Sequence, residues 1–194
     1  MTSLPDFSEL ALDLDAWRTW FRDTAQLICS VVHAQSVAIF FQTDVKLDGR
    51  WLDKSFLVQL GAQSAAAHLL WHKIVCRAPA GVTTKGRPGY AHLLCFSREL
   101  RLTDVQATPD VLSKLGAMTW SRAMGLAACE ATSQFLVQHT RCRTVVDPFC
   151  GVGSMLAVAN RHGLDAIGVE ISSRRAARAR TLQLTPKLLA KTER

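Results

Sequence analysis

The sequence predicts an α/β fold in which a doubly wound sheet carries an antiparallel edge hairpin. The first observation is an alternation late in the chain, where strand, glycine turn, helix, strand and basic helix follow one another at 144–147, 148–153, 154–162, 166–170 and about 173–190. This order is typical of doubly wound sheets. The second observation is a pair of strand-forming runs on either side of a loop rich in glycine and proline, at 67–76 and 90–97, which predicts an antiparallel pair.

The remaining elements are read from hydrophobic spacing. Apolar residues recur at helical spacing from Phe7 to Val32, which predicts a long amphipathic helix. The run Ser36–Phe41 is continuously apolar and rich in strand formers, so we expect a buried parallel strand. The segment Arg98–Leu115 is polar and contains a proline, and we expect it to be irregular. Helical spacing returns from Trp120 to Phe135, which predicts a second helix.

Length and composition predict a single domain, residues 1–194. With 194 residues, 48% of them hydrophobic, the chain can bury one sizeable core but hardly two. No run of 18 apolar residues occurs, and residues 1–9 carry acids without a basic segment, so neither a membrane span nor a signal peptide is predicted. The six cysteines lie far apart without a C-x-x-C pair, which indicates a reduced, cytoplasmic protein and no bound metal.

The charge favours a polyanionic partner. The net charge is +7 and the pI about 9.4, which suits RNA or DNA, although many basic proteins bind neither. The excess is concentrated in the last 21 residues, at Arg174, Arg175, Arg178, Arg180, Lys187, Lys191 and Arg194. The alternative for this segment is a solvated helix face.

The most informative stretch is the turn after the strand at 144–147. That strand ends in Asp147, and Gly151 and Gly153 allow a tight turn and a close approach to a ligand before the next helix. Nineteen residues after Gly151, Glu170 ends the next predicted strand, where a carboxylate reaches the ribose of a bound nucleoside. The third glycine of a nicotinamide site is replaced by Leu156, and no lysine follows as in a nucleotide-triphosphate loop. An adenosine ligand without phosphates fits better than either, with a generic glycine turn as the alternative.

The run Asp147–Met155, with the sequence DPFCGVGSM, resembles the D-P-F-x-G-x-G-[ST] loop of class I S-adenosylmethionine methyltransferases. This form of the loop is used by amino-methyltransferases of DNA and by some RNA enzymes. The resemblance implies a Rossmann-like fold, methyltransferase activity and S-adenosyl-L-methionine as cofactor. It also implies that Glu170 binds the ribose and that the loop surrounds the methionine part of the cofactor, through Asp147, Pro148, Phe149, Gly151 and Gly153.

The position of this loop late in the chain resembles the permuted amino-methyltransferases, in which the catalytic half precedes the cofactor half. The resemblance implies a catalytic and substrate half at 1–98, a linker at 99–117 and a cofactor half at 118–194. Thr119 and Trp120 fall where the helix before the loop holds the methionine end of the cofactor.

The catalytic motif of that family is [DNS]-P-P-[YFW], and the start of this chain offers S-L-P-D instead. Ser3 and Pro5 match the first and third positions, Asp6 stands at the fourth, and Phe7 would have to supply the face that stacks on a base. Asp6 can act as a general base or accept a hydrogen bond from a different nucleophile. The alternative is an irregular segment without a catalytic role. The strand that should feed this motif is missing, so either the start codon is set too late or the sheet is shortened.

Further substrate contacts are expected around the strand at 36–41. Gln42 and Asp44 follow its end, at the edge where such folds bind ligands. Lys46 and Lys54 lie in a charged loop that follows, for which a solvated turn is the alternative. The predicted strand pair also carries His72, Lys73 and His92. The sequence fits a structural role for these residues as well as it fits a contact with substrate.

Glu99–Ala117 is too short to form an independent base-reading domain, so recognition of RNA by shape is favoured over reading a DNA duplex. We therefore expect an RNA methyltransferase, acting on tRNA or rRNA. The alternatives are a DNA amino-methyltransferase, a small-molecule methyltransferase and a non-catalytic scaffold subunit that keeps the adenosine pocket. A homodimer is an alternative to the monomer.

Overall fold

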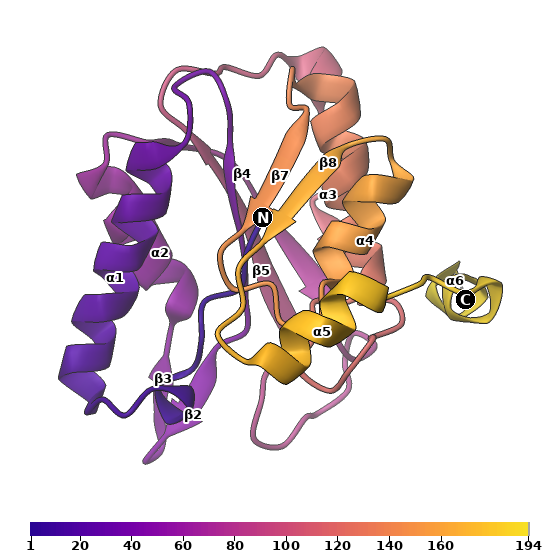
Figure 1. Ribbon diagram of the computed structural model, residues 1–194. Helices are drawn as coiled ribbons and strands as arrows, with labels where there is room; N and C mark the ends of the chain where they lie inside the picture. The colour runs from indigo at the N-terminus through magenta and orange to yellow at the C-terminus, as the bar shows by residue number, and fades with distance from the viewer. Residues whose placement is uncertain (194) are drawn as a thin grey trace. The chain divides into compact units, whose positions relative to one another are not determined.

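The computed structural model describes residues 1–193 and forms two compact units (Figure 1). We call Leu4–Val111 the N-terminal unit, and Met1–Ser3 together with the chain from Leu112 onward the C-terminal unit. The boundary between them falls inside the predicted linker 99–117. Arg194, one of the basic residues singled out above, lies outside the described residues. Among residues 1–193, no helix combines the length and apolar character needed to cross a bilayer.

The N-terminal unit is built on a four-stranded sheet in the order β1 (Ala38–Gln42), β5 (Tyr90–Ser97), β4 (His68–Cys76) and β6 (Val111–Leu112). The antiparallel pairing of β4 with β5 confirms the predicted hairpin. The prediction of a parallel strand for β1 is wrong, because β1 pairs with β5 in antiparallel register. Every residue of β1 is buried. Its continuous apolar run therefore indicates that both faces of the strand are covered, and it does not indicate whether the strand is parallel or antiparallel.

Two helices pack against each other in this unit, α1 (Leu14–Val31) and α2 (Lys54–Ser64). The predicted first helix is interrupted, because a short 3-10 turn precedes α1 and the side chain of Asp13 caps α1 by accepting a hydrogen bond from the Ala16 amide at 2.8 Å. One face of α1 buries Trp17, Phe21, Ala25 and Cys29. The helices approach closely at Gly61, where an added Cβ would lie 2.4 Å from the Arg22 carbonyl oxygen.

Two elements of the N-terminal unit were not predicted. A hairpin joins β2 (Val45–Leu47) to β3 (Arg50–Leu52), and its turn residues Asp48 and Gly49 both have positive φ, at 50° and 73°. An Asp-Gly pair is the sequence signal for such a turn. Asp53 then caps α2 by accepting a hydrogen bond from the Phe56 amide. The sequence therefore contained local signals for both elements.

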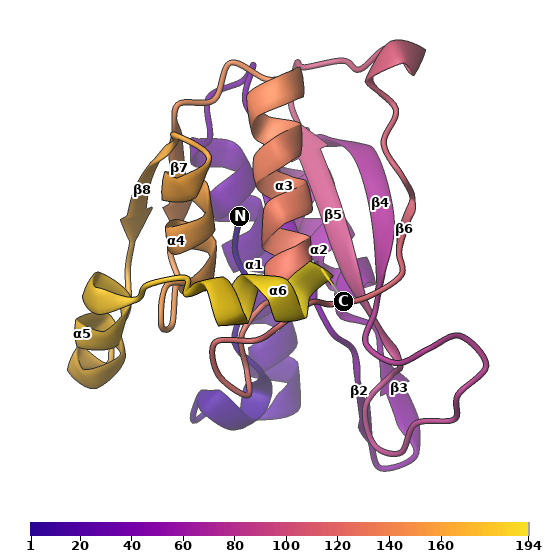
Figure 2. The ribbon, with the colours of Figure 1, turned by 90° about the vertical axis from the view of Figure 1, so that its right-hand side faces the viewer.

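The C-terminal unit contains the predicted alternation of strands and helices. Its order is α3 (Leu126–His139), β7 (Thr144–Asp147), α4 (Ser154–Arg161), β8 (Asp165–Gly168), α5 (Ser173–Thr181) and α6 (Pro186–Glu193). The strands β7 and β8 are parallel, and Figure 2 shows α3 and α4 packed side by side. Helix α3 begins at Leu126 and not at Trp120, and the predicted basic helix is divided into α5 and α6 because Pro186 starts a new helix.

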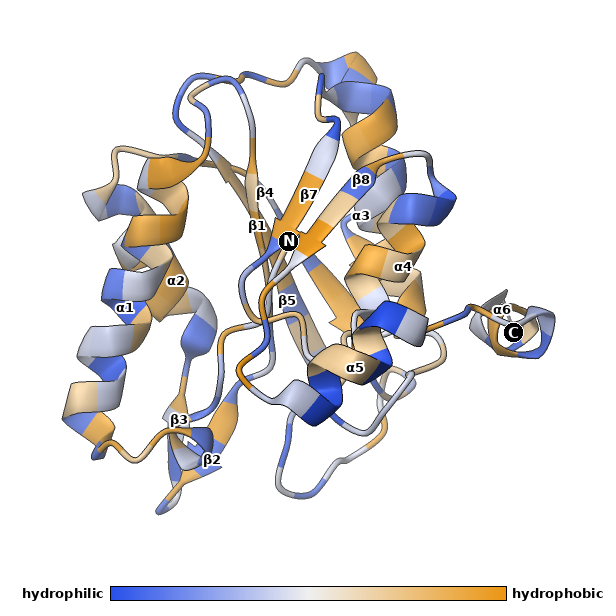
Figure 3. Ribbon diagram, viewed as in Figure 1, coloured by the Kyte–Doolittle hydropathy of each residue, from blue (hydrophilic) through white to orange (hydrophobic). Residues whose placement is uncertain are grey.

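Each unit has its own apolar core. Figure 3 shows apolar residues along β7 and β8, where Val146 and Ile167 are 52% and 55% exposed, and polar residues along α5. All six cysteines are free, and Cys29, Cys95, Cys129 and Cys150 are buried as small core residues. Burial raises the pKa of the Cys29 thiol to about 12 and that of Cys150 to about 11, so neither is a ready nucleophile.

Candidate functional site

The turn between β7 and α4 (residues 147–153), which we call the cofactor turn because the sequence predicts a cofactor there, depends on two glycines in the left-handed region. Gly151 has φ 57°, and Gly153, the N-cap of α4, has φ 82°. A Cβ at Gly151 would meet the Trp120 ring at 3.4 Å, and one at Gly153 would lie 3.0 Å from the Ala179 Cβ. The left-handed backbone favours glycine at both positions, and at Gly153 the close Ala179 side chain adds a second reason. Amide groups at such a turn are available to a ligand.

Asp147 closes β7 and is completely buried. One carboxylate oxygen accepts a hydrogen bond from the Phe149 amide at 3.1 Å, which ties the start of the turn to the strand. Burial raises the pKa of Asp147 above its ordinary value, and the Met1 ammonium group, the Thr2 hydroxyl and the Phe149 amide only partly offset this. Asp147 is therefore a buried residue that holds the start of the turn through its hydrogen bond with the Phe149 amide.

Glu170 lies two residues beyond the end of β8 at Gly168, so the predicted strand is slightly too long. Its Oε1 accepts hydrogen bonds from the Ser172 amide and from Arg175 Nη2, both at 2.7 Å. Burial alone would raise the pKa of Glu170, but these two donors and the Gly151 amide outweigh it, and the pKa lies below its usual value. Glu170 is therefore a charged acceptor beside the cofactor turn.

Four side chains from other segments of the C-terminal unit lie around the turn. The Thr119 and Ser154 hydroxyls lie 2.5 Å apart, which joins the segment before α3 to the start of α4. The Arg175 guanidinium lies 5.9 Å from the centroid of the Trp120 ring. Arg175 was counted with the basic residues expected to meet a polyanion, but the structure commits it to Glu170. Thus Thr119, Trp120 and Glu170 gather at the predicted turn, with Ser154 and Arg175 as additions.

The predicted catalytic motif is divided between the two units. Ser3 belongs to the C-terminal unit, whereas Pro5 and Asp6 belong to the N-terminal unit. The Pro5 carbonyl oxygen, expected to accept a hydrogen bond from the substrate, accepts one from the Trp17 indole at 3.1 Å. Phe7, expected to stack on a base, packs edge-on against the ring of Trp17 with the centroids 6.3 Å apart. The motif is therefore anchored on α1.

Asp6 is held by two cations. One carboxylate oxygen pairs with Lys54 Nζ, and the other lies 3.2 Å from Arg87 Nη2. The Lys54 side chain is only 5% exposed, so Lys54 does not reach a substrate phosphate as expected and positions Asp6 instead. Arg87 was not predicted, since nothing in the local sequence links the 77–90 loop to residue 6.

Asp44 is also buried and does not contact solvent. Its Oδ1 accepts a hydrogen bond from the Lys54 amide at 2.9 Å, and its Oδ2 accepts from Trp51 Nε1 at 2.9 Å and contacts His92 Nε2 at 3.0 Å. Burial would raise the pKa of Asp44, but the hydrogen bonds from His92, Lys54 and Trp51 lower it below its ordinary value. Gln42 is buried as well, so neither Gln42 nor Asp44 lies at the solvent-exposed surface where a substrate contact was expected.

His72 and His92, whose roles the sequence did not decide, form hydrogen bonds that continue from Asp44. His72 Nε2 lies 2.9 Å from His92 Nδ1, which extends the network from Asp44 to β4. We call Asp6, Asp44, Lys54, His72 and His92 the polar cluster. Among residues 1–193, Asp44, Asp53 and His92 also place metal-ligating atoms within 4.8 Å of one another, but both oxygens of Asp44 are engaged by protein donors. Hydrogen bonds therefore account for this grouping without a metal.

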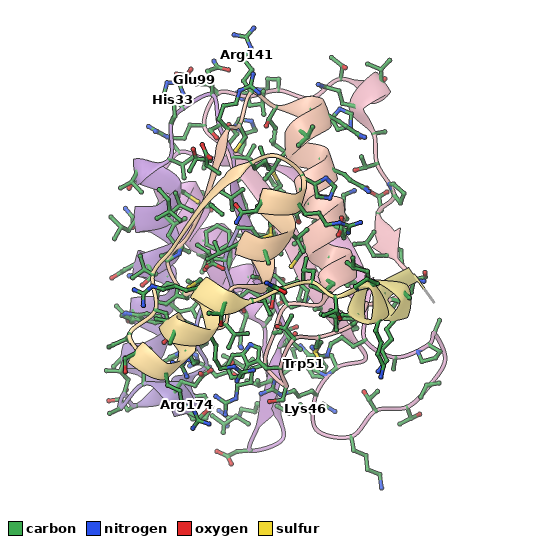
Figure 4. All side chains as sticks on the ribbon, turned by 45° about the vertical axis from the view of Figure 1, so that its right-hand side comes forward. His33, Lys46, Trp51, Glu99, Arg141 and Arg174 are labelled. Atoms are coloured by element: carbon green, nitrogen blue, oxygen red, sulfur yellow. The ribbon has the colours of Figure 1, made fainter. Side chains whose placement is uncertain are left out.

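Lys46 is the predicted substrate residue that stays exposed. Figure 4 shows it beside Trp51 on the β2–β3 hairpin, with Nζ 5.3 Å from the centroid of the indole ring. Trp51 is itself 45% exposed while its indole N–H is fixed by Asp44. An exposed cation over an exposed aromatic ring is suited to contact with a phosphate and a base.

No family model matches the chain, and no curated protein matches it in sequence. Solved structures do resemble it. A proposed DNA modification methylase from Thermus thermophilus, in complex with S-adenosyl-L-methionine, has a TM-score of 0.71 at 17% identity, over 99% of this chain and 85% of that chain. PvuII DNA methyltransferase, specific for cytosine N4, has a TM-score of 0.71 at 14% identity, over 100% of this chain and 82% of that chain.

A third structure, the complex of M1.HpyAVI with SAM, has a TM-score of 0.58 at 14% identity and covers 93% of this chain and 84% of that chain. The likeness extends over 93% or more of this chain, so it includes the antiparallel strands of the N-terminal unit as well as the βαβ segment of the C-terminal unit. The predicted α/β fold is therefore confirmed: the chain has the fold of these methyltransferases.

Proposed function

We propose that the protein binds S-adenosyl-L-methionine at the cofactor turn and transfers its methyl group to an amino group of a nucleic acid. The observation that carries this proposal is Glu170, a charged carboxylate held beside Gly151 by Ser172 and Arg175 at the carboxyl end of two parallel strands. A carboxylate in that place suits the two hydroxyls of an adenosine ribose. The glycine turn has no lysine for a triphosphate.

The residues present fit this cofactor. The turn presents backbone amides without side chains in front of them, and Trp120 lines it at Gly151. When bound, S-adenosylmethionine supplies a methyl group on a positively charged sulfur. Two of the solved structures with this fold are described as complexes with the same molecule, which supports the proposal. The order of parts supports a permuted arrangement, with the cofactor turn after the polar cluster.

For the substrate, DNA is favoured over the RNA expected from the sequence. The sequence argument rested on the short segment Glu99–Ala117, which leaves little room for a base-reading domain. Two of the solved structures with this fold are described as DNA enzymes, and one of these as specific for cytosine N4. The exposed pair of Lys46 and Trp51 suits an unstacked base and its phosphate in either polymer. An exocyclic amine of DNA is therefore the first acceptor to test, and RNA the second.

Asp6 is the residue assigned to the acceptor amine. Lys54 and Arg87 fix its carboxylate, and a carboxylate held in this way can accept an N–H hydrogen bond from an amine. The aromatic position of the family motif is taken by Asp6, and Phe7 is packed on Trp17. Base stacking is therefore assigned to Trp51.

The first test is calorimetry with S-adenosylmethionine and its demethylated product. Glu170→Ala removes a charge-assisted contact, so we expect a loss of about 2 kcal/mol in binding. Glu130→Ala is the matched control, because Glu130 is a carboxylate of the same unit that is paired with Arg161 on α4. Equal affinity in the wild type and Glu170→Ala would contradict the proposed cofactor site.

The second test separates an enzyme from a scaffold subunit. The engaged carbonyl of Pro5 is the observation that favours a scaffold, since it removes one acceptor of the family motif. Incubation with methyl-labelled cofactor and duplex DNA, single-stranded DNA or RNA, followed by nucleoside mass spectrometry, is expected to show label on an exocyclic amine of DNA. Label on RNA alone would restore the expectation from sequence. Cofactor binding without label in any polymer would favour the scaffold.

A further inference from the structure

Arg77 and Arg87 lie at the two ends of the loop that joins β4 to β5. Arg77 follows directly after β4, and its amide donates to the Gly89 carbonyl oxygen at 2.7 Å, so the loop is closed two residues beyond Arg87. Arg87 follows Gly86, which has φ 81°, and its carbonyl oxygen accepts a hydrogen bond from the Thr84 hydroxyl at 2.9 Å. The backbone therefore holds the two arginines as neighbours at the base of the loop.

Arg77 is a half-buried cation without a carboxylate partner. Its guanidinium Nη1 lies 3.5 Å from the Thr43 hydroxyl oxygen, and no aspartate or glutamate among residues 1–193 forms an ion pair with it. Burial lowers the pKa of Arg77, and the positive charge of the neighbouring Arg87 lowers it further. An arginine side chain nevertheless stays protonated in a protein. Arg77 therefore carries a permanent charge that no acidic side chain in the described part of the chain neutralises by direct contact.

Arg87 uses only part of its guanidinium group inside the protein. Its Nη2 lies 3.2 Å from Asp6 Oδ2, whereas its Nε and Nη1 form no hydrogen bond with any residue in the described range. The side chain is 51% exposed, so a ligand can approach it from solvent. The other oxygen of Asp6 is taken by Lys54 Nζ. One carboxylate thus contacts both Lys54 and Arg87, while Arg77 beside them contacts none.

Thr43 adds a hydroxyl group to the two guanidinium groups. It is half-buried and lies between Gln42 at the end of β1 and Asp44. Its oxygen accepts the hydrogen bond from Arg77, so its own hydrogen is available to a further acceptor. All these groups belong to the N-terminal unit. The unit therefore brings together two cationic donors and a hydroxyl donor with unused hydrogen-bonding capacity.

We propose that Arg77, Arg87 and Thr43 bind one phosphate group of the nucleic-acid strand, an inference that rests on the proposed function and identifies a contact of its substrate. A guanidinium group presents a planar fork of N–H donors that matches two oxygens of a phosphate. Two neighbouring guanidinium groups repel each other, and an anion bound by both removes this repulsion. Because Arg87 also contacts Asp6, a phosphate on its remaining nitrogens lies next to the carboxylate assigned to the acceptor amine.

The geometry of the donors favours a phosphate over a carboxylate. A carboxylate has two oxygens in one plane, whereas a phosphate directs its oxygens tetrahedrally and can accept from two forks and a hydroxyl at different angles. A free phosphate ion has the same chemistry as a phosphate of the strand. The experiments therefore use both inorganic phosphate and an oligonucleotide as probes.

The first experiment measures binding of the full chain to a fluorescein-labelled single-stranded DNA oligonucleotide at increasing salt concentration. The double variant Arg77→Gln/Arg87→Gln should bind about 10-fold or more weakly at low salt, because charge-assisted hydrogen bonds are lost. If both arginines bind one phosphate, the slope of log affinity against log salt should fall by about 0.7, and if they bind two phosphates it should fall by about 1.4. A fall of the larger size would contradict the shared site.

The matched control is Arg18→Gln/Arg22→Gln, which removes two arginines from the exposed face of α1, where each is paired with an aspartate. We expect this variant to keep the wild-type slope. The conservative variant Arg77→Lys keeps the charge but lacks the fork, so it should keep most of the slope and lose part of the affinity. Equal affinity and slope in the wild type and in Arg77→Gln/Arg87→Gln would overturn the proposal.

Urea unfolding separates a binding role of Arg77 from a structural one. In chloride buffer, Arg77→Gln should unfold at the same urea concentration as the wild type or at a higher one, because the repulsion from Arg87 is removed. Inorganic phosphate should raise the urea midpoint of the wild type more than that of the variant, since it binds the folded wild type. The general stabilisation by phosphate salts is common to both proteins and cancels in this comparison. A lower midpoint for Arg77→Gln in chloride, with the same response to phosphate, would identify Arg77 as structural and overturn the proposal.

The possible failures can be told apart. If the wild type methylates the oligonucleotide and Arg77→Gln has an unchanged KM for it, the phosphate contact is contradicted and the proposed function stands. If Arg77→Gln loses the response to inorganic phosphate but binds the oligonucleotide like the wild type, the ligand is a free phosphate and the assignment to the strand is contradicted. If the oligonucleotide shows the expected change of slope but no polymer is methylated, the phosphate contact stands and the proposed function is contradicted.

Discussion

The cofactor turn is formed by residues close together in the sequence, whereas the polar cluster is formed by residues far apart in the sequence. The cofactor turn joins neighbouring elements, β7, α4 and β8, and its shape follows from two glycines with positive φ and from Glu170 just after β8. The polar cluster joins a segment before α1, a loop after β1, the start of α2 and two strands of a sheet. The first depends on local backbone conformation and the second on sheet register and buried charge.

This difference predicts different responses to mutation. Disruption of the turn should change ligand binding with a moderate loss of stability, because the strain is local. Disruption of the polar cluster should reduce the stability of the N-terminal unit, because each member is the hydrogen-bond partner of another buried group.

The largest effect is expected for Asp44→Ala. This change leaves His92, the Lys54 amide and the Trp51 indole without their acceptor in a buried site, and breaking such a network costs about 3–5 kcal/mol of unfolding free energy. Asp53→Ala is the matched control, because it removes the exposed cap of α2 and should cost about 1 kcal/mol. Urea unfolding checks both, and equal losses would show that Asp44 acts only as a local cap.

A smaller loss is expected for Gly153→Ala in the cofactor turn. A left-handed conformation costs a residue with a side chain about 1–2 kcal/mol, and here the new Cβ would also meet Ala179 at 3.0 Å. Gly163→Ala is the control, with φ 75° and no neighbour within 4 Å, so it isolates the cost of the backbone conformation. Only Gly153→Ala should weaken cofactor binding in calorimetry. Equal binding in both variants would separate the turn from the cofactor site.

The smallest effect concerns pH and has opposite signs in the two units. The pKa of Asp44 is lowered on folding, so its contribution to stability is present above the unfolded value of about 3.9 and is lost as pH falls through the folded pKa. The pKa of Asp147 is raised, so between about 3.9 and its folded pKa the folded state binds more protons and stability falls as pH rises.

Asp44→Asn should therefore reduce the loss of unfolding free energy as the pH falls. Asp147→Asn should reduce the loss of unfolding free energy as the pH rises. Unfolding curves from pH 3 to pH 8 measure both, and shifts of the same sign would contradict the contrast between the units.

The sequence by itself predicted the elements that are continuous in the chain. The alternation from Thr144 to Thr181, the hairpin of β4 and β5, and the cofactor turn with Glu170 all follow from hydrophobic spacing and glycine positions. The hairpin of β2 and β3 was equally available in Asp48-Gly49 and was overlooked. These features are local because hydrophobic period and positive φ are properties of short segments.

Only the tertiary structure decided which polar residues are buried together. Gln42, Asp44 and Lys54 were expected at the surface of the site, but the antiparallel register of β1 and β5 and the entry of α2 place them inside it. The pairing of Asp6 with Lys54, and of His72 with His92, joins residues far apart in sequence. Sequence spacing carries no information on such pairs, because the free energy that selects them, the cost of burying a charge without a partner, arises only when the whole unit has folded.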